Sequence, residues 1–255
     1  MTTTRHAPAA SRPSGQLAGP VPHAIIPAAL SALLVLSAVA LLAWPGRGAL
    51  FEGIAGGTAA SPLAGLAGLV ADKGLLALVA ITAGLVLLTW FRDRSRFWLL
   101  AAAGVGAVAA YGTSEVVKLL VTEERPCRVV DVATVLACPP AGDWSWPSNH
   151  STIAGALAVA CLLVAPRLWP LVVPLAVAVA GARVAAGVHY VHDVASGLAL
   201  GVLVTCLVGL TVHAGVQRLT GARTPTRAQQ LPGAQRLTRR STSHPSPAAR
   251  PTRGR

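Results

Sequence analysis

The stretch FWLLAAAGVGAVAAYGTSEVVKLLV, residues 97–121, indicates the fold class of this chain. A helix that crosses a bilayer needs about 20 mostly apolar residues, and this run is longer than that. Its only charged residues are Glu115 and Lys118, close to its end. The stretch therefore predicts a transmembrane helix, and charged groups at the end of such a helix are candidates for function.

The rest of the chain shares this apolar character. Of its 255 residues, 53% are hydrophobic and 12% are charged, whereas a soluble domain is typically about 25% charged. The apolar content excludes disorder of the whole chain. The glycine pattern and the four cysteines exclude a collagen-like or a disulfide-rich secreted protein. The composition fits an all-α integral membrane protein.

Six apolar stretches predict six transmembrane helices in a bundle. The second of them begins earlier if residues 63–70 join it, and the fourth is short unless it begins at His150. The first follows a basic N-terminus, as a signal peptide would, but its apolar run is too long for a typical signal core. The six stretches are residues 24–44, 75–90, 97–121, 152–165, 171–188 and 194–216.

The formal net charge of +12 lies almost wholly outside these stretches. Residues 217–255 hold nine arginines and no acidic residue, and residues 1–23 add Arg5 and Arg12. We therefore expect two basic, disordered tails around a membrane domain at residues 24–216. The C-terminal tail has no aromatic residue, which argues against nucleic-acid binding. Anionic lipid headgroups are the expected partners of both tails.

Arginine and lysine in short loops mark the cytoplasmic side of a membrane protein. Three arginines in residues 91–96, Arg167 and both basic tails fall on one side of a six-helix topology. Both termini are therefore predicted to be cytoplasmic, in a cell membrane. The opposite, outer side receives residues 45–74, 122–149 and 190–193.

Two groups of polar residues lie at predicted helix ends on that outer side. Lys118 and Arg125 follow the third helix, and taken alone they also fit two interfacial cations that snorkel to lipid headgroups. Ser148 is the predicted N-cap of the fourth helix, followed by Asn149 and His150. A helix N-terminus favours anions through its unpaired N–H groups. A simple cap with an interfacial histidine is the alternative interpretation.

A third group contains Arg183, His189 and Asp193. Arg183 lies inside the fifth apolar stretch and needs a partner there. His189 and Asp193 share one face if the turn stays helical, and a carboxylate on one imidazole nitrogen leaves the other free to react. A His–Asp pair that closes a turn is the alternative, but it leaves Arg183 unexplained. With Lys118 and Arg125, the three groups predict an oxyanion site at the outer ends of helices three, four and five.

The three groups have the pattern Lys-x6-Arg-Pro, Pro-Ser-x-His and Arg-x5-His-x3-Asp, and this ordered signature resembles the type 2 phosphatidic acid phosphatase superfamily. That superfamily includes bacterial undecaprenyl-diphosphate phosphatases, phosphatidylglycerophosphate phosphatases and eukaryotic lipid phosphate phosphatases. The resemblance implies that His189 is a nucleophile that forms a phosphohistidine, that Asp193 orients it and that His150 protonates the leaving oxygen. It implies no metal and no other cofactor, because side-chain cations neutralise the phosphate. The implied phosphate-binding residues are Lys118, Arg125, Ser148, Asn149 through its amide, and Arg183.

Two positions depart from the family's pattern. Asn149 stands where glycine is usual, and Ala182 stands where a serine often precedes the arginine. His192 is an additional histidine beside Asp193, and the pattern leaves its role open.

Three further residues near the predicted site carry smaller expectations. Cys127 and Cys138 lie in the outer loop, where an oxidising exterior permits a disulfide. Glu115 lies one helical turn before Lys118 and is placed to pair with it.

The resemblance predicts an integral membrane phosphatase that hydrolyses a lipid phosphate or diphosphate at the outer leaflet. A polyprenyl (undecaprenyl-type) diphosphate is the first candidate substrate, and phosphatidate and phosphatidylglycerophosphate are the alternatives within the class. A non-catalytic lipid-phosphate binding or transport protein is the alternative from another class. The complete set of nucleophile, acid and orienting aspartate argues against it. The sequence makes no prediction of the oligomeric state.

Overall fold

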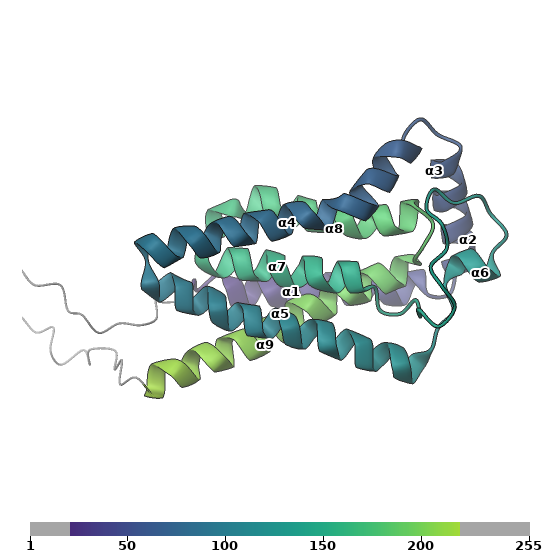
Figure 1. Ribbon diagram of the computed structural model, residues 1–255. Coiled ribbons are helices and arrows are strands. Elements are labelled where there is room, and N and C mark those ends of the chain that lie inside the picture. Colours follow the sequence, from purple (N-terminus) through teal and green to yellow (C-terminus); the bar gives the residue numbers. More distant parts are fainter. Residues whose placement is uncertain (1–20, 220–255) are drawn as a thin grey trace, which may run out of the picture. The chain divides into compact units, whose positions relative to one another are not determined.

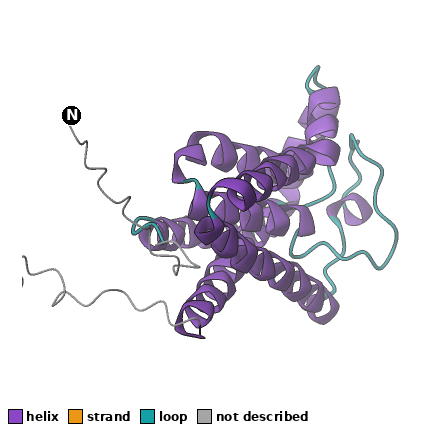
Figure 2. Ribbon diagram, turned by 60° about the vertical axis from the view of Figure 1, so that its left-hand side comes forward, coloured by secondary structure: helices purple, strands orange, loops and turns teal. Residues whose placement is uncertain are grey.

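The computed structural model describes residues 21–219, and within that range the chain folds into helices and loops without a strand (Figure 2). Most of both predicted tails lies outside the described residues, so their disorder stays a prediction. The long helices are α1 (Ile25–Ala43), α4 (Ala64–Arg92), α5 (Arg94–Val121), α7 (Asn149–Val164), α8 (Trp169–Ala185) and α9 (Val191–Leu219). The short ones are α2 (Arg47–Phe51), the π-helix η1 (Glu52–Gly56), α3 (Gly57–Ala59), α6 (Pro126–Val129) and the 3-10 helix η2 (Pro166–Leu168).

Each of the six predicted stretches overlaps one of the long helices, and the largest overrun is in the fifth stretch, because α8 ends at Ala185, three residues before the predicted end. Within residues 21–219, five helical segments are long and apolar enough to cross a membrane. The exception is α7, whose 16 residues rise about 24 Å, less than the hydrocarbon thickness of roughly 30 Å. Most of its residues are buried, so protein rather than lipid surrounds it and its length need not match the bilayer. A sixth crossing stays a prediction.

The boundaries of α4 and α5 show one expectation met and one corrected. Helix α4 begins at Ala64, as expected if the apolar residues 63–70 join the second stretch. Asp93 alone separates α4 from α5, and its carboxylate accepts the backbone N–H of Arg96 at 3.1 Å, which caps α5. The loop predicted at residues 91–96 is therefore a single residue long.

Helices α7 and α9 cross closely through small residues. A Cβ atom on Gly197 would lie 2.6 Å from the carbonyl oxygen of Ser148, and one on Gly155 would lie 2.7 Å from that of Leu198. Such close backbone approach requires residues without side chains, as at many helix contacts in membranes. At this crossing the backbone N–H of Ser148 donates to the carbonyl oxygen of Asp193 at 3.1 Å. The packing therefore joins the start of α7 to the start of α9.

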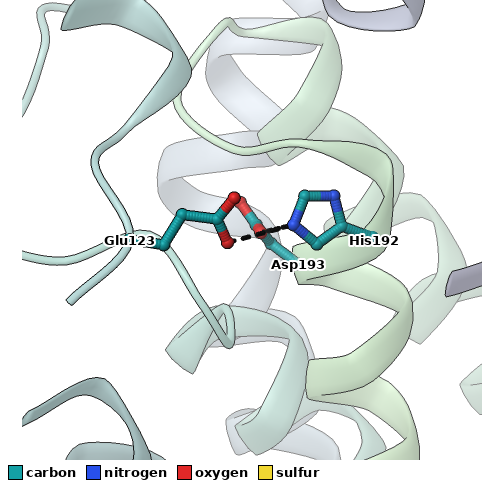
Figure 3. A group of neighbouring side chains, drawn as sticks. All are labelled: Glu123, His192 and Asp193. Carbon is teal, nitrogen blue, oxygen red and sulfur yellow. Dashed lines mark hydrogen bonds and ion pairs between the residues drawn. The ribbon is translucent and has the colours of Figure 1, made fainter. Parts of the chain in front are cut away.

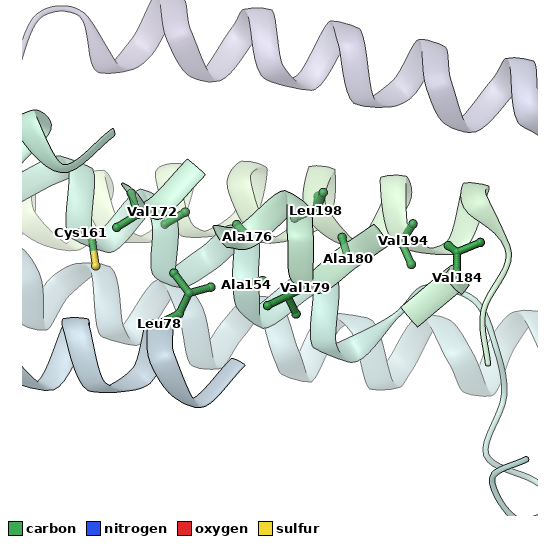
Figure 4. Packing of buried hydrophobic residues seen from close by; sticks show 11 residues of the cluster. Leu78, Ala154, Cys161, Val172, Ala176, Val179, Ala180, Val184, Val194 and Leu198 are labelled. Atoms are coloured by element: carbon green, nitrogen blue, oxygen red, sulfur yellow. The ribbon is translucent and has the colours of Figure 1, made fainter. Parts of the chain in front are cut away.

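The main apolar core lies between α4, α7, α8 and α9 (Figure 4). It consists largely of small and β-branched side chains, represented by Leu78 of α4, Ala154 and Cys161 of α7, Val179 of α8 and Leu198 of α9. In contrast, α1 exposes most of its large apolar side chains. An apolar helix of this kind is expected to face lipid.

Most of the residues that were predicted to lie on the outer side of the membrane gather at one end of the helices, where Figure 1 shows α2, α3 and α6. We call this end, made by residues 44–63, 122–148 and 186–190, the loop end. The turn between α4 and α5 lies at the opposite end.

Candidate active site

His189 and Asp193 meet at the loop end, although no helix runs through both of them. Helix α8 ends at Ala185, Gly187 has a φ of +86°, and α9 begins at Val191. A positive φ costs glycine little, so the chain turns and places His189 in a linker. Nδ1 of His189 lies 3.2 Å from Oδ2 of Asp193. The predicted pair therefore forms through a turn rather than on one helix face.

Asp193 is fully buried, and three donors converge on one of its oxygens. Oδ2 accepts hydrogen bonds from Oγ of Ser145 at 2.5 Å and from the backbone N–H of Tyr190 at 2.8 Å, in addition to the contact with His189. Such donors stabilise a buried carboxylate as the anion and fix its orientation. Asp193 is therefore an oriented acceptor for the imidazole.

His189 is a neutral imidazole with a fixed tautomer. Burial lowers the pKa of His189 to about 4, although the hydrogen bond and the charge of Asp193 act to raise it. Because the carboxylate can only accept, Nδ1 carries the hydrogen and Nε2 keeps its lone pair. Nε2 lies 3.1 Å from Nη1 of Arg125. A ring in this state can act as a nucleophile or as a base.

Arg125 is buried and holds three parts of the loop end together. Its Nη1 donates to the carbonyl oxygen of Val188 at 2.9 Å and also contacts His189. Its Nε and Nη2 donate to the main-chain oxygen and to Oδ1 of Asp143, at 2.7 Å and 2.9 Å. The backbone of Arg125 is extended before Pro126, as expected ahead of a proline.

Asp143 places its carboxylate between two of the predicted phosphate-binding cations. Oδ1 lies 2.9 Å from Nη2 of Arg125 and 3.4 Å from Nζ of Lys118. Burial opposes ionisation, but the hydrogen bonds and charges of Arg125 and Lys118 outweigh it and hold the pKa of Asp143 below its usual value. One anionic oxygen therefore already occupies a position that faces both cations.

Ser148 is the N-cap residue of α7, as predicted. Its side chain makes no cap hydrogen bond within the described residues. Its hydroxyl instead accepts from Oγ of Ser151 at 3.2 Å, while its backbone N–H donates to Asp193. Ser148 therefore links α7 to the carboxylate-bearing turn of α9.

The side chain of Asn149 is used in a contact between α7 and α5. Its Oδ1 accepts from Oγ of Ser114 at 2.7 Å, and its Nδ2 donates to the carboxylate of Glu115. Glu115 pairs with Asn149 rather than with Lys118, which corrects the expected pairing. Glycine, the usual family residue here, has no side chain to make either contact.

His150 and Arg183 lie near the cations but make no hydrogen bond to the site residues described above. His150 is half-buried in the first turn of α7, within electrostatic range of Arg183, Arg125 and Lys118. Arg183 is buried in the last turn of α8, where Nη1 donates to the carbonyl oxygen of Ala71 at 3.3 Å. Its Nε has no hydrogen-bond partner in the described part of the chain. A buried donor of this kind is costly to leave unpaired, so it is suited to an anion.

Two residues that shape the site were not predicted. Asp143 is the only acidic residue between Asp131 and Asp193, and this isolation was a usable signal. Ser145 is a single serine in a loop, and its sequence context carries no signal.

The disulfide that the sequence permitted is present, between Cys127 and Cys138. Arg128 also donates a hydrogen bond to the carbonyl oxygen of Pro139 across the same loop. The segment that follows Arg125 is therefore cross-linked.

The chain is similar to known proteins in sequence and in fold. Residues 97–216 match the model of the PAP2 superfamily. A transmembrane PAP2 type phosphatidylglycerolphosphate phosphatase from Bacillus subtilis, known from a crystal structure, has a similar fold, with a TM-score of 0.52 and 21% identity. That likeness covers 73% of this chain and 96% of the other.

Two curated relatives are more similar in sequence. Over 125 residues, the chain is 38% identical to the decaprenylphosphoryl-5-phosphoribose phosphatase of Mycobacterium tuberculosis. This match covers 49% of this chain and 66% of that protein. Over 98 residues, the chain is 38% identical to the undecaprenyl-diphosphatase of Sulfolobus acidocaldarius. This second match covers 38% of this chain and 47% of that protein. The chain thus spans less than two thirds of the length of each relative.

Proposed function

Because the chain carries a PAP2 superfamily domain at residues 97–216, we propose that it is an integral membrane phosphatase that releases phosphate from a lipid phosphate or diphosphate. Both curated relatives are named for polyprenyl-linked substrates. We therefore place a polyprenyl phosphate or diphosphate first, with the undecaprenyl-type diphosphate among them. Phosphatidate and phosphatidylglycerophosphate come second.

The proposed reaction has two steps. Nε2 of His189 attacks phosphorus, and an N–P bond forms as the bond between phosphorus and the leaving oxygen breaks. Asp193 keeps its hydrogen bond to Nδ1–H and stabilises the charge that develops on the ring, while His150 gives a proton to the leaving oxygen. Water then attacks the phosphohistidine, His150 accepts the proton of that water, and the N–P bond breaks to release phosphate.

The contact between Arg125 and His189 is the observation that carries this proposal. The guanidinium lies 3.1 Å from the Nε2 lone pair, on the side from which phosphorus has to approach. When phosphate binds, Nη1–H of Arg125 can donate to a phosphate oxygen instead of to Nε2 of His189. The lone pair on Nε2 is then free, next to phosphorus. The unpaired Nε of Arg183 offers a further donor to the same anion.

The position of Asp143 supports a phosphate site between the cations. Its carboxylate oxygen contacts both Lys118 and Arg125, in the way that a phosphate oxygen would. The side chain is 45% exposed, so it can move away without breaking a packed core. In the proposed cycle, substrate phosphate displaces this carboxylate.

An apolar groove beside the site suits a lipid tail. It has a volume of about 450 Å³ and lies between α1, α5 and α9. Trp146 and Pro147, which directly precede Ser148, form part of its wall, together with Ser196 and Leu200 of α9. A prenyl chain in this groove would stay among apolar side chains while its phosphate reaches the cations.

The proposed orientation places the loop end outside the cell and both termini in the cytoplasm. Arg92, Arg94 and Arg96 lie at the α4–α5 turn, and Arg167 lies in η2. Positive residues in such short connections favour the cytoplasmic side. The active site would then face the outer leaflet.

Phosphate release by purified protein in detergent or vesicles tests the proposal. The panel contains undecaprenyl diphosphate, decaprenylphosphoryl-5-phosphoribose, phosphatidate and phosphatidylglycerophosphate, with H189A as the matched inactive control. We expect release from a polyprenyl substrate and none from H189A. Binding of these lipids without release from any of them would instead favour the non-catalytic binding or transport protein.

A further inference from the structure

His192 is a buried histidine for which the proposed reaction has no role. It is the second residue of α9, directly before Asp193, and only 1% of its surface is exposed. Figure 3 shows its imidazole facing the carboxylates of Glu123 and Asp193. Glu123 comes from the loop that follows α5.

The two oxygens of Asp193 have different surroundings. Oδ2 receives the donors from Ser145, Tyr190 and His189. Oδ1 is buried and has no hydrogen-bond partner within residues 21–219, but it lies 3.0 Å from Nε2 of His192. The orientation of the carboxylate at Oδ1 therefore depends on His192.

One nitrogen of His192 faces both carboxylates. Nε2 lies 3.1 Å from Oε2 of Glu123 in hydrogen-bond geometry, so its single hydrogen points to Glu123. The nearby oxygen of Asp193 is then held by charge rather than by a second hydrogen bond. A positively charged ring satisfies both buried anions at once, which a neutral ring cannot do.

Two aromatic rings enclose His192 and favour the same charge state. The ring of Tyr190 stacks on the imidazole with centroids 5.3 Å apart, and the ring of Trp44 meets it edge-on with centroids 4.5 Å apart. The face of an aromatic ring attracts a cation, and the stacked ring of Tyr190 presents its face. With the two carboxylates, it favours an imidazolium, whose buried Nδ1–H group has no hydrogen-bond partner within residues 21–219.

We propose that His192 is a positioning residue, whose imidazolium, anchored by Glu123, holds Oδ1 of Asp193 and so, together with the donors on Oδ2, aims Oδ2 at Nδ1 of His189. Without this contact the carboxylate is held only through Oδ2, by Ser145 and the backbone N–H of Tyr190, so it can tilt and misalign the acceptor of the Nδ1–H group. The proposal rests on the proposed function, because it requires His189 to be the nucleophile.

Glu123 is itself held from the side opposite to His192. Nε of Arg47 lies 3.7 Å from Oε1 of Glu123, and the same guanidinium lies over the ring of Trp44, 4.5 Å from its centroid. A continuous row of contacts therefore runs from the start of α2 through Glu123 and His192 to Asp193. The loop end thus supports Asp193 from outside α9.

The same three side chains are close enough to hold a divalent cation, since one donor atom of each lies within 4.8 Å of the others. Two features favour a proton instead. Arg47 already supplies positive charge at Glu123, and a single ring nitrogen already meets an oxygen of each carboxylate. The two interpretations predict different responses to a chelator.

The test compares kcat, KM and inhibition by vanadate in full-length purified variants. H192F keeps a ring but removes the charge and the donor, and we expect kcat to fall about 10- to 100-fold, as for a misaligned catalytic group, with KM and vanadate inhibition almost unchanged. H192Q loses the charge but has two amide N–H donors, one for Glu123 and one for Oδ1 of Asp193, and should restore kcat to within about fivefold of wild type. H213Q is the matched control, because His213 is an equally buried histidine farther along α9; it should leave all three quantities unchanged.

E123Q provides a second route if H192F does not fold. This variant removes the negative charge that anchors His192 and keeps the size of the side chain at position 123. We expect kcat to fall about 3- to 10-fold without a change in KM. Because His192 and Glu123 act as one unit, the combined effect in H192Q/E123Q should be smaller than the product of the two single effects.

Several outcomes would overturn this proposal. One is wild-type kcat in H192F. Another is a fall in kcat that H213Q reproduces together with the same loss of thermal stability. A third is that EDTA abolishes the activity of the wild type and a divalent cation restores it, while H192Q shows no such response. This result would assign Glu123, His192 and Asp193 to a metal site. An active H189A would contradict the proposed function itself, whereas an inactive H189A with a fully active H192F contradicts only the role of His192.

Discussion

Asp193 and Asp143 both contact the core of the candidate site, but the protein holds them in opposite ways. Asp193 is fully buried at the start of a long helix, with three donors on one oxygen. Asp143 lies in a loop, with a side chain that is 45% exposed and a single oxygen shared by Lys118 and Arg125. In the proposed cycle, Asp193 is a permanent carboxylate that prepares the nucleophile, and Asp143 is an exchangeable one that occupies the phosphate position.

The largest expected effect comes from removing the charge of the permanent carboxylate. D193N should lower kcat by about 10³-fold or more, because an amide in place of the acceptor lets His189 adopt the wrong tautomer. The measurement is single-turnover phosphate release from the preferred lipid, with thermal unfolding recorded in parallel. A folded D193N with near-normal kcat would remove the distinction between the two aspartates.

Replacing the arginine that connects the two aspartate regions should have the next largest effect. R125K keeps a positive charge but loses the forked guanidinium that meets Val188, His189 and Asp143 together. We expect kcat/KM to fall about 10²-fold, since lysine cannot reproduce this planar geometry. K118R is the comparison, because Lys118 makes a single point contact with Asp143, and it should lose less activity than R125K.

The burial of the His189–Asp193 pair predicts the acid limb of the pH profile. Because burial lowers the pKa of His189 to about 4, the ring stays neutral down to that pH and becomes protonated, hence unreactive, below it. The acid limb of kcat/KM reports the free enzyme and should therefore lie near pH 4 with two different lipid substrates. A limb at the usual histidine pKa with both substrates would show that His189 is not held as a buried neutral ring.

The smallest expected effect has the opposite sign. D143N removes the anion that competes with phosphate for Lys118 and Arg125, so vanadate should inhibit D143N at about two- to fivefold lower concentration than wild type, in keeping with the modest energies of half-exposed ion pairs. Asp143 is ionised above its lowered pKa, so the difference should be present at neutral pH and vanish in strong acid. Weaker vanadate inhibition in D143N would instead make Asp143 a structural support of the cations.

The sequence predicted the charged residues of the site better than their partners. Lys118, Arg125 and Arg183 could be found because cations at the ends of apolar helices, or inside them, are costly without a function. His189 and Asp193 could be found by their spacing. Asp143 and Ser145 reach the site only through the path of a loop, and the spacing of residues in a sequence does not determine such a path.

The helices could likewise be predicted in kind but not in every detail. Long apolar runs predicted α1, α4, α5, α8 and α9, which are long and apolar enough to span a membrane. The length of α7 depends on packing, because glycine residues of α7 and α9 allow a close crossing that surrounds α7 with protein. The turn at Gly187 depends on the positive φ of that residue. Composition alone cannot distinguish such an internal helix from one that faces lipid.

In the proposed reaction, the contact with Asp193 makes His189 a nucleophile. Trapping the covalent intermediate tests this role most directly. Acid-sensitive, base-stable label from a ³²P-labelled lipid substrate would be collected by rapid quenching and mapped by mass spectrometry. We expect ³²P label on His189 of the wild type and none in H189A. Turnover without labelled protein, or label on another residue, would contradict it.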